Sequence, residues 1–220
     1  MTAPPAGVCV PVCAVCAAPC PPPFRAPTAE LAPDLDGRPG EPARSTLRRW
    51  VARCRSCGAA SSDLASLPAI AAETVRRPDY AAEPDSFLRW AQICHAAGQL
   101  EAAAEATLQA AWSAEDAGRD AAPLRRRAAG LWQGDPLRQI DILRRAAAFA
   151  EAQALAHAAS FPPDTAAAQI LAFERARIDA QDPARYAISS ALRPPASKPH
   201  VTHGQKSPPT LLARLFGRRD

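Results

Sequence analysis

The middle of the chain repeats hydrophobic residues with the period of an α-helix. Between residues 84 and 97 the apolar positions lie three or four residues apart, which places them on one helix face: Phe87, Trp90, Ala91, Cys94 and Ala97. The preceding segment Glu83-Pro84-Asp85-Ser86 combines a proline with acids, as helix starts do. Gly98, directly after the stripe, is a typical helix stop. The pattern therefore predicts a helix over about residues 84–97.

The same periodicity predicts five further helices. They begin near residues 100, 120, 135, 149 and 164, and glycines or prolines separate most of them. Breaks of two to four residues cannot carry the chain far, so consecutive helices should pack as antiparallel neighbours. We therefore expect a right-handed stack of helical hairpins.

Two turns in this region resemble each other. The segments Gly98-Gln99-Leu100-Glu101-Ala102-Ala103 and Ala147-Ala148-Phe149-Ala150-Glu151-Ala152 each place a large apolar residue two positions after a small one, with alanine three residues later. This arrangement is typical of tetratricopeptide hairpins. The two turns are 49 residues apart, against about 34 in that repeat. The sequence thus predicts a tetratricopeptide-like domain with an additional helix between the turns.

The flanking regions lack a sustained period. Many of the 24 prolines lie before residue 45 or after residue 182. Residues 47–52 could form a short strand, and residues 63–67 and 69–76 could form single helical turns. We therefore predict a mainly α protein with four parts. These are a small irregular or β module with a Pro-rich loop (1–62), a connecting segment (63–83), the helical domain (84–183) and a disordered basic tail (184–220).

The charge is unevenly distributed along the chain. The formal net charge of +4 divides into +3 for residues 1–60, −5 for residues 61–183 and +6 for residues 184–220. All basic residues except Lys198 and Lys206 are arginines, which together with the abundant Ala and Pro indicates a coding-composition bias. The basicity is therefore weak evidence for nucleic-acid binding.

No stretch of the sequence has the features of a membrane span or a signal peptide. A run of about 18 apolar residues is missing, and residues 1–24 contain no Lys or Arg for a signal n-region. Residues 210–219 could form one or two amphipathic turns, which are too short to anchor the chain alone. We expect a cytoplasmic protein without a membrane span.

Two C-x2-C pairs are the strongest chemical signal in the sequence. The four cysteines are Cys13 and Cys16 in the first pair and Cys54 and Cys57 in the second. Four thiolates at such spacings are the ligands of a tetrahedral structural zinc ion, and in a reducing cytosol paired cysteines bind metal more often than they form disulfides. Arg53 and Arg55 flank the second pair and would offset the negative charge of the site. The sequence thus predicts structural Zn²⁺ and makes residues 1–62 a zinc-ribbon-like module.

Two other interpretations of the cysteines remain open. Cys9, Cys13, Cys16 and Cys20, followed by proline, resemble an iron–sulfur run, although the first gap is one residue too long and Cys54 and Cys57 would be idle. The cysteines could instead be unliganded. Cys9 or Cys20 could also replace a member of the first pair.

Several other residues have chemical potential but a simpler structural interpretation. Cys94-His95 suggests a nucleophile and its base, yet adjacent helix residues point about 100° apart, so Cys94 is expected in the core. His157 is expected on a helix surface, and His200 and His203 lie in the predicted tail. The runs Arg125-Arg126-Arg127 and Arg144-Arg145 are expected on a solvated face, with an anion patch as the alternative.

The order of these parts resembles a family of uncharacterised bacterial proteins in which a tetra-cysteine zinc ribbon precedes tetratricopeptide-like helices. The specific part is Trp50 to Ala60, read as "WVARCRSCGAA", which is similar to the family pattern of Trp, Cys-Pro-x-Cys-Gly and small residues. The sequence departs from that pattern at Arg55, where proline is usual, and at Ala17, where glycine is usual. The resemblance implies no reaction.

These features predict a non-enzymatic adaptor in which a zinc-stabilised ribbon lies beside a helical-repeat surface that binds a protein or peptide. The alternative is a nucleic-acid-binding zinc ribbon, favoured by the arginines near the second pair: Arg48, Arg49, Arg53 and Arg55. An enzyme is not expected, because the sequence offers no Ser/His/Asp set, paired catalytic carboxylates or glycine-rich phosphate loop.

Overall fold

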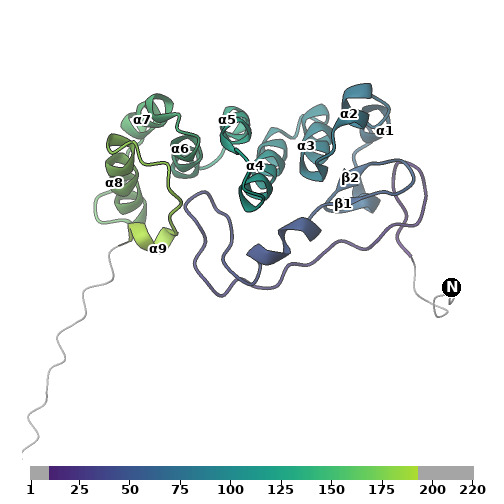
Figure 1. Cartoon of the computed structure of the whole chain (residues 1–220), viewed down its shortest axis with the longest axis horizontal. Helices are drawn as coiled ribbons and strands as arrows, with labels where there is room; N and C mark the ends of the chain where they lie inside the picture. The colour runs from purple at the N-terminus through teal and green to yellow at the C-terminus, as the bar shows by residue number, and fades with distance from the viewer. Residues whose placement is uncertain (1–9, 193–220) are drawn as a thin grey trace, which may run out of the picture.

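The computed structural model describes residues 10–192 and confirms a mainly helical fold with a small N-terminal sheet. The long helices follow one another in a curved row (Figure 1). Their bounds are α3 Ser86–Ala96, α4 Leu100–Asp116, α5 Ala122–Leu131, α6 Pro136–Arg145, α7 Phe149–Ala158 and α8 Ala166–Asp179. Each of the six packs against the next in sequence, as the short breaks predicted. The tetratricopeptide register stays a prediction.

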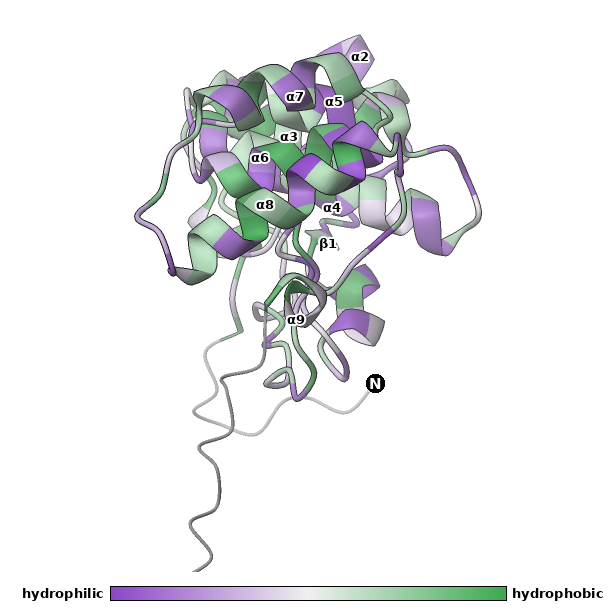
Figure 2. Ribbon diagram, turned by 90° about the vertical axis from the view of Figure 1, so that its left-hand side faces the viewer, coloured by the Kyte–Doolittle hydropathy of each residue, from purple (hydrophilic) through white to green (hydrophobic). Residues whose placement is uncertain are grey.

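The helix ends follow from local chemistry. The Asp85 carboxylate accepts hydrogen bonds from the backbone N–H groups of Phe87 and Leu88 at 2.8 and 3.1 Å, and Asp135 caps α6 in the same way. Gly98 ends α3 with a φ of +72°, a backbone conformation that glycine adopts at little cost. The long helices in front, such as α7 and α8, carry both hydrophilic and hydrophobic residues (Figure 2), as expected when one face is buried.

The short elements precede the long helices. A 3₁₀ helix, η1, spans Arg44–Arg49, and the strands β1 Ala52–Arg53 and β2 Ala60–Ser61 form an antiparallel pair. They are followed by η2 Leu64–Ser66, α1 Ala71–Thr74 and α2 Pro78–Ala82. The helical turns predicted within residues 63–67 and 69–76 are thus confirmed, whereas α2 was not predicted.

The strand predicted over residues 47–52 is wrong for residues 47–51, because β1 begins only at Ala52. Trp50 N–H donates to the Leu47 carbonyl at 3.0 Å, and its indole N–H donates to Thr46 Oγ1 at 2.9 Å. These local bonds wind the chain into η1, and only residues beyond Val51 meet a partner strand. Pairing therefore begins immediately before the second cysteine pair.

The Pro-rich loop is part of the helical core. The chain from the first cysteine pair to η1 runs along one side of the helical row (Figure 1). Asp36 in this loop is fully buried, and its carboxylate accepts hydrogen bonds from Trp112 Nε1 and Arg125 at 2.8 and 2.9 Å. Leu35 joins the main hydrophobic cluster. The described part of the N-terminal segment, residues 10–62, therefore packs directly against the helices.

The expectation of a solvated face for both arginine runs is wrong for three residues. The side chains of Arg125, Arg144 and Arg145 point inward and pair with acids, whereas Arg126 and Arg127 are exposed. The acids include Asp36 from the loop and Glu174 from α8. The inward-pointing arginines therefore join segments that are far apart in sequence.

Order extends further toward the C-terminus than predicted. Residues 184–192 are ordered, so the disorder predicted for residues 184–220 is wrong for these nine residues. Tyr186 stacks edge-on against Phe173 with ring centroids 5.1 Å apart, and its carbonyl accepts from Leu35 N–H at 3.0 Å. The short helix α9, Ile188–Ala191, follows. His200, His203 and residues 210–219 lie outside the described residues.

Candidate metal centre

Two matched turns carry the four cysteines. In the first turn, Ala17 N–H donates to the Cys13 carbonyl at 2.8 Å, and in the second, Gly58 N–H donates to the Cys54 carbonyl at 3.0 Å. The first turn is closed by an isolated bridge between Val12 and Pro19, and the second by the β1–β2 pair. Each C-x2-C segment is therefore a tight loop that turns both of its side chains the same way.

The residue after each second cysteine has a left-handed backbone. Gly58 has a φ of +78°, and Ala17, where the sequence lacks the usual glycine, has a φ of +56°. Alanine in this region is disfavoured by roughly 1–2 kcal/mol. The first turn thus adopts the same shape as the second despite the substitution.

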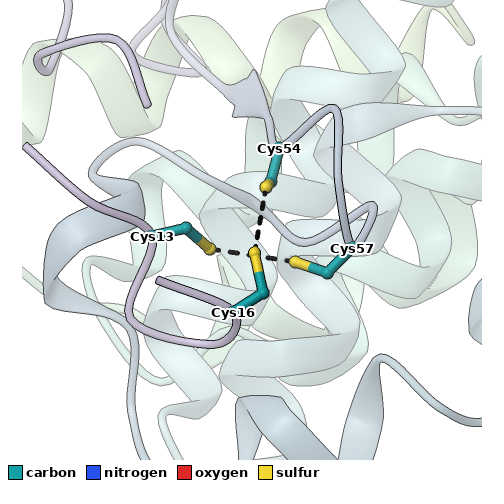
Figure 3. Close-up of side chains that lie close together, drawn as sticks. All are labelled: Cys13, Cys16, Cys54 and Cys57. Atoms are coloured by element: carbon teal, nitrogen blue, oxygen red, sulfur yellow. Dashed lines mark hydrogen bonds between the residues drawn. The ribbon is translucent and has the colours of Figure 1, made fainter. Parts of the chain in front are cut away.

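The two turns face each other and bring the four sulfurs together (Figure 3). The ligand atoms of Cys13, Cys16, Cys54 and Cys57 all lie within 4.8 Å of one another. Across the turns, Cys13 Sγ is 3.8 Å from Cys57 Sγ and Cys16 Sγ is 3.6 Å from Cys54 Sγ. A disulfide requires about 2.05 Å, so all four cysteines are free.

These sulfur positions fit a tetrahedral metal ion. Zinc–thiolate bonds of about 2.3 Å place the sulfurs of a regular tetrahedron about 3.8 Å apart, close to both distances above. All four donors are soft sulfur ligands, which favour zinc among the common divalent ions. Four such ligands would complete the coordination of the ion and leave no position for a reacting water. The arrangement therefore suits a structural metal.

The environment of the sulfurs is uneven. The N–H of Ala18 hydrogen-bonds to the Cys16 sulfur and lowers the pKa of that thiol to about 7. Burial raises the pKa of Cys57 to about 12 and also raises the pKa of Cys13. A metal ion must displace the protons of these raised thiols, so binding would release protons and tighten as the pH rises.

Cys20 is not one of the four. It is buried in a small hydrophobic cluster with Cys13, Cys54, Ala59 and Leu64, but it falls outside the group whose sulfurs lie within 4.8 Å of one another. The structure instead brings Cys54 and Cys57 into the group, which the iron–sulfur interpretation would leave idle. Cys9 lies outside the described residues.

The second turn is seated on the helices by two residues that the sequence analysis did not identify. Tyr80 of α2 is fully buried; its hydroxyl accepts from Ala60 N–H at 3.0 Å and donates to the Gly58 carbonyl at 3.3 Å. Arg89 of α3 donates to the same carbonyl at 3.1 Å. The sequence offered one signal for Arg89: it is a charged residue directly beside Trp90, which belongs to the apolar stripe of its helix.

The other candidate residues are separated from the metal centre or from each other. Cys94 is fully buried while its neighbour His95 is exposed, and burial raises the pKa of the Cys94 thiol to about 12. Such a thiol is unreactive at neutral pH, which supports the core interpretation. His157 is exposed, as expected.

No protein-family model matches the chain, and neither does a curated protein or a solved structure. Within residues 10–192, no helix is long and apolar enough to cross a membrane. The assignment of a function therefore depends on the geometry of the chain itself.

Proposed function

We propose that the protein is a non-enzymatic adaptor in which a structural zinc ion fixes the N-terminal segment against the helices, so that the two together form a binding surface for another protein. The convergence of four cysteine sulfurs at the start of the helical row carries this proposal. Zinc at this position would supply cross-linking and no hydrolytic chemistry.

The side of the row covered by the Pro-rich loop is a poor site for a partner. The arginines on that side already form ion pairs with Asp36: Arg145 lies 2.6 Å and Arg125 2.9 Å from its carboxylate. A partner would have to displace a fully buried and fully paired side chain. We therefore place the binding surface elsewhere.

A groove beside the second cysteine pair is open and suited to a partner. One part, a cavity of about 460 Å³, lies between residues 24–26 and α4 and is lined by aromatic side chains: Phe24, Trp50 and Trp90. An adjoining cavity of about 500 Å³ shares Phe24 and Val51 with the first. Aromatic side chains in a concave site are typical anchors for a partner's apolar residue.

The adjoining cavity is basic. It is lined by Arg25, Arg48 and Arg49, which are exposed and form no ion pair among the described residues. The guanidinium of Arg49 lies 4.1 Å from the Phe24 ring centroid, so charge and apolar surface meet at one point. The complementary partner is an extended peptide with acidic residues next to a large apolar one.

Peptide binding tests the proposal. Fluorescein-labelled peptides with an Asp/Glu cluster beside Leu or Phe would be titrated with zinc-loaded protein, and the same peptides with Lys in place of the acids serve as controls. We expect binding of the acidic series, weakened at least tenfold by Arg48→Glu with Arg49→Glu. The matched control is Arg126→Glu with Arg127→Glu, an equally exposed pair on α5. Equal effects of both pairs would contradict the groove.

The nucleic-acid alternative predicts a different result. Its support is the same cluster of arginines near the second pair, extended by Arg53 and Arg55, which line a hollow of about 580 Å³. A labelled single-stranded oligonucleotide should then bind with an affinity that falls steeply with salt, while the acidic peptides should not bind. That outcome would replace the adaptor proposal.

A further inference from the structure

Arg89 is the most unusual cation in the described part of the chain. It lies on α3 and is only 4% exposed. Its Nε donates to the Glu83 carbonyl at 2.5 Å, and its two terminal nitrogens donate to the carbonyls of Gly58 and Ala81 at 3.1 and 2.8 Å. No carboxylate pairs with it among the described residues, unlike buried Arg125 and Arg144. A buried guanidinium without a negative partner is strongly disfavoured.

A candidate for that negative partner is the sulfur cluster. Gly58, which accepts from Arg89, directly follows Cys57, and a Cβ atom added to Gly58 would lie only 3.1 Å from the terminal nitrogen of Arg89. Cys54, Cys57 and Arg89 line one hollow. Four thiolates around Zn²⁺ carry a formal charge of about −2.

We propose that Arg89 is the buried counter-cation of the tetrathiolate zinc centre, and that it couples metal occupancy to the packing of α2 and α3. This inference rests on the proposed structural zinc. With metal bound, the negative charge of the thiolates balances the guanidinium. Without the metal centre Arg89 keeps its charge but has no negative partner, so the surrounding helices loosen.

The neighbouring contacts supply a route for this coupling. The Gly58 carbonyl accepts hydrogen bonds from both Arg89 and the Tyr80 hydroxyl. The Arg89 guanidinium also lies 5.0 Å from the Tyr80 ring centroid. Ala81 and Glu83, the other acceptors, are at the end of α2. A shift of the second cysteine turn would therefore be felt by α2 and α3 at once.

A simpler role is also defined by these contacts. The carbonyls of Ala81 and Glu83 are at the C-terminal end of α2, where a cation is favoured by the helix dipole. If Arg89 only caps α2, its replacement would destabilise the protein equally with and without metal. The metal dependence of the effect therefore separates the two roles.

The test measures zinc affinity of the full chain by competition with a chromophoric chelator. Arg89→Met keeps the length of the side chain and removes the charge, Arg89→Lys restores a charge, and Arg53→Met removes an exposed arginine beside the same Gly58. We expect Arg89→Met to weaken zinc binding roughly 10- to 100-fold, as removal of outer-shell partners does. Arg89→Lys should recover part of the affinity. Arg53→Met should change it less than threefold, because Arg53 is exposed and solvent screens its interaction with the site.

Hydrogen exchange of the wild-type protein provides a second readout that needs no variant. Chelation of the metal should increase amide exchange in α2 and α3 more than in α7 and α8. Unchanged affinity in Arg89→Met, or equal exchange in both regions, overturns the coupling while leaving the zinc site intact. If the wild-type protein binds no zinc, the proposed structural zinc fails, and the role of Arg89 fails with it.

Discussion

Arg125 and Asp36 lie 89 residues apart in the sequence, yet the Arg125 guanidinium is 2.9 Å from the Asp36 carboxylate and both side chains are buried. The carboxylate also accepts a hydrogen bond from Trp112 Nε1 at 2.8 Å and pairs with the Arg145 guanidinium at 2.6 Å. Although burial alone raises the pKa of Asp36, Arg145 and Arg125 lower it to about 2. The Pro-rich loop is therefore held to the helices by an ionised side chain.

Replacing Asp36 should be strongly destabilising. Asp36→Asn removes the charge that balances Arg125 and Arg145, and breaking a buried pair costs roughly 3–5 kcal/mol. Urea unfolding of the zinc-loaded protein would measure the loss. The control is Asp79→Asn, whose partner Arg77 is about half exposed; a surface pair of that kind is worth about 0–1 kcal/mol. Similar losses for the two variants would show that Asp36 is not a structural anchor.

Two carboxyls compete for one buried arginine at the other end of the row. Arg144 pairs with Asp141 and with Glu174, the latter at 2.7 Å, and all three are fully buried. One guanidinium balances only one of the two acids. Burial, with the charges of Glu174 and Asp36 next in size, raises the pKa of Asp141 to about 8 against the attraction of Arg144 and Arg145.

This raised pKa predicts that the contribution of Asp141 to stability falls with increasing pH. The folded protein holds a proton that unfolded Asp141 releases near pH 4, so the contribution is complete below pH 4 and is lost as the pH rises toward about 8. Asp141→Asn should remove this falling contribution between pH 5 and 8, measured as the difference from the wild type in the free energy of unfolding at fixed excess zinc. The exposed control Asp120→Asn should retain the wild-type slope. If Asp141→Asn kept the wild-type slope as well, Asp141 would be ionised in the fold.

Sequence periodicity predicted the long helices well because their apolar stripes and stops are local signals. The predicted start of the second helix at residue 100 matches α4, and the Asp135-Pro136 start matches α6. The convergence of Cys13 and Cys16 with Cys54 and Cys57 was also predictable, since two C-x2-C pairs in one sequence are typical of a four-cysteine site.

The buried charges could not be predicted in the same way. Whether Arg125 or Arg126 points inward depends on where Asp36 meets the helix, which is a long-range contact. The order of residues 184–192 depends similarly on Tyr186 reaching Phe173 and the loop. Composition alone predicted a solvated face for the arginine runs and disorder for residues 184–192. It contains no information about a single partner that is distant in the sequence.

Ala17→Gly should stabilise the metal-loaded protein. Ala17 has a φ of +56°, which alanine adopts at a cost of about 1–2 kcal/mol and glycine does not. Part of the gain is offset by the greater freedom of glycine in the unfolded chain, so we expect roughly 0.5–1 kcal/mol in chemical unfolding. Ala18→Gly, one residue on and without a positive φ, should be neutral or destabilising. A loss of stability in Ala17→Gly would contradict the left-handed turn.

Metal content is the most direct prediction for the sulfur cluster. Protein purified without added metal should contain about one zinc per chain. Cys54→Ala should lose the ion, whereas Cys20→Ala should retain it, because Cys20 is buried in the same small cluster but lies outside the four converging sulfurs. Elemental analysis of the three proteins makes the comparison.

The cysteine turns and the distant helices should respond unequally to the loss of that ion. In Cys54→Ala, hydrogen exchange should rise most in residues 10–20 and 50–62, which carry the two turns, while α6 to α8 keep their protection through Arg144 and the contacts of Tyr186. Far-ultraviolet circular dichroism should therefore retain most of the helical signal. Iron with visible absorbance, or equal zinc in Cys54→Ala and the wild type, would exclude the four-thiolate zinc site. Loss of the whole helical circular-dichroism signal in Cys54→Ala would show that the metal stabilises the entire fold.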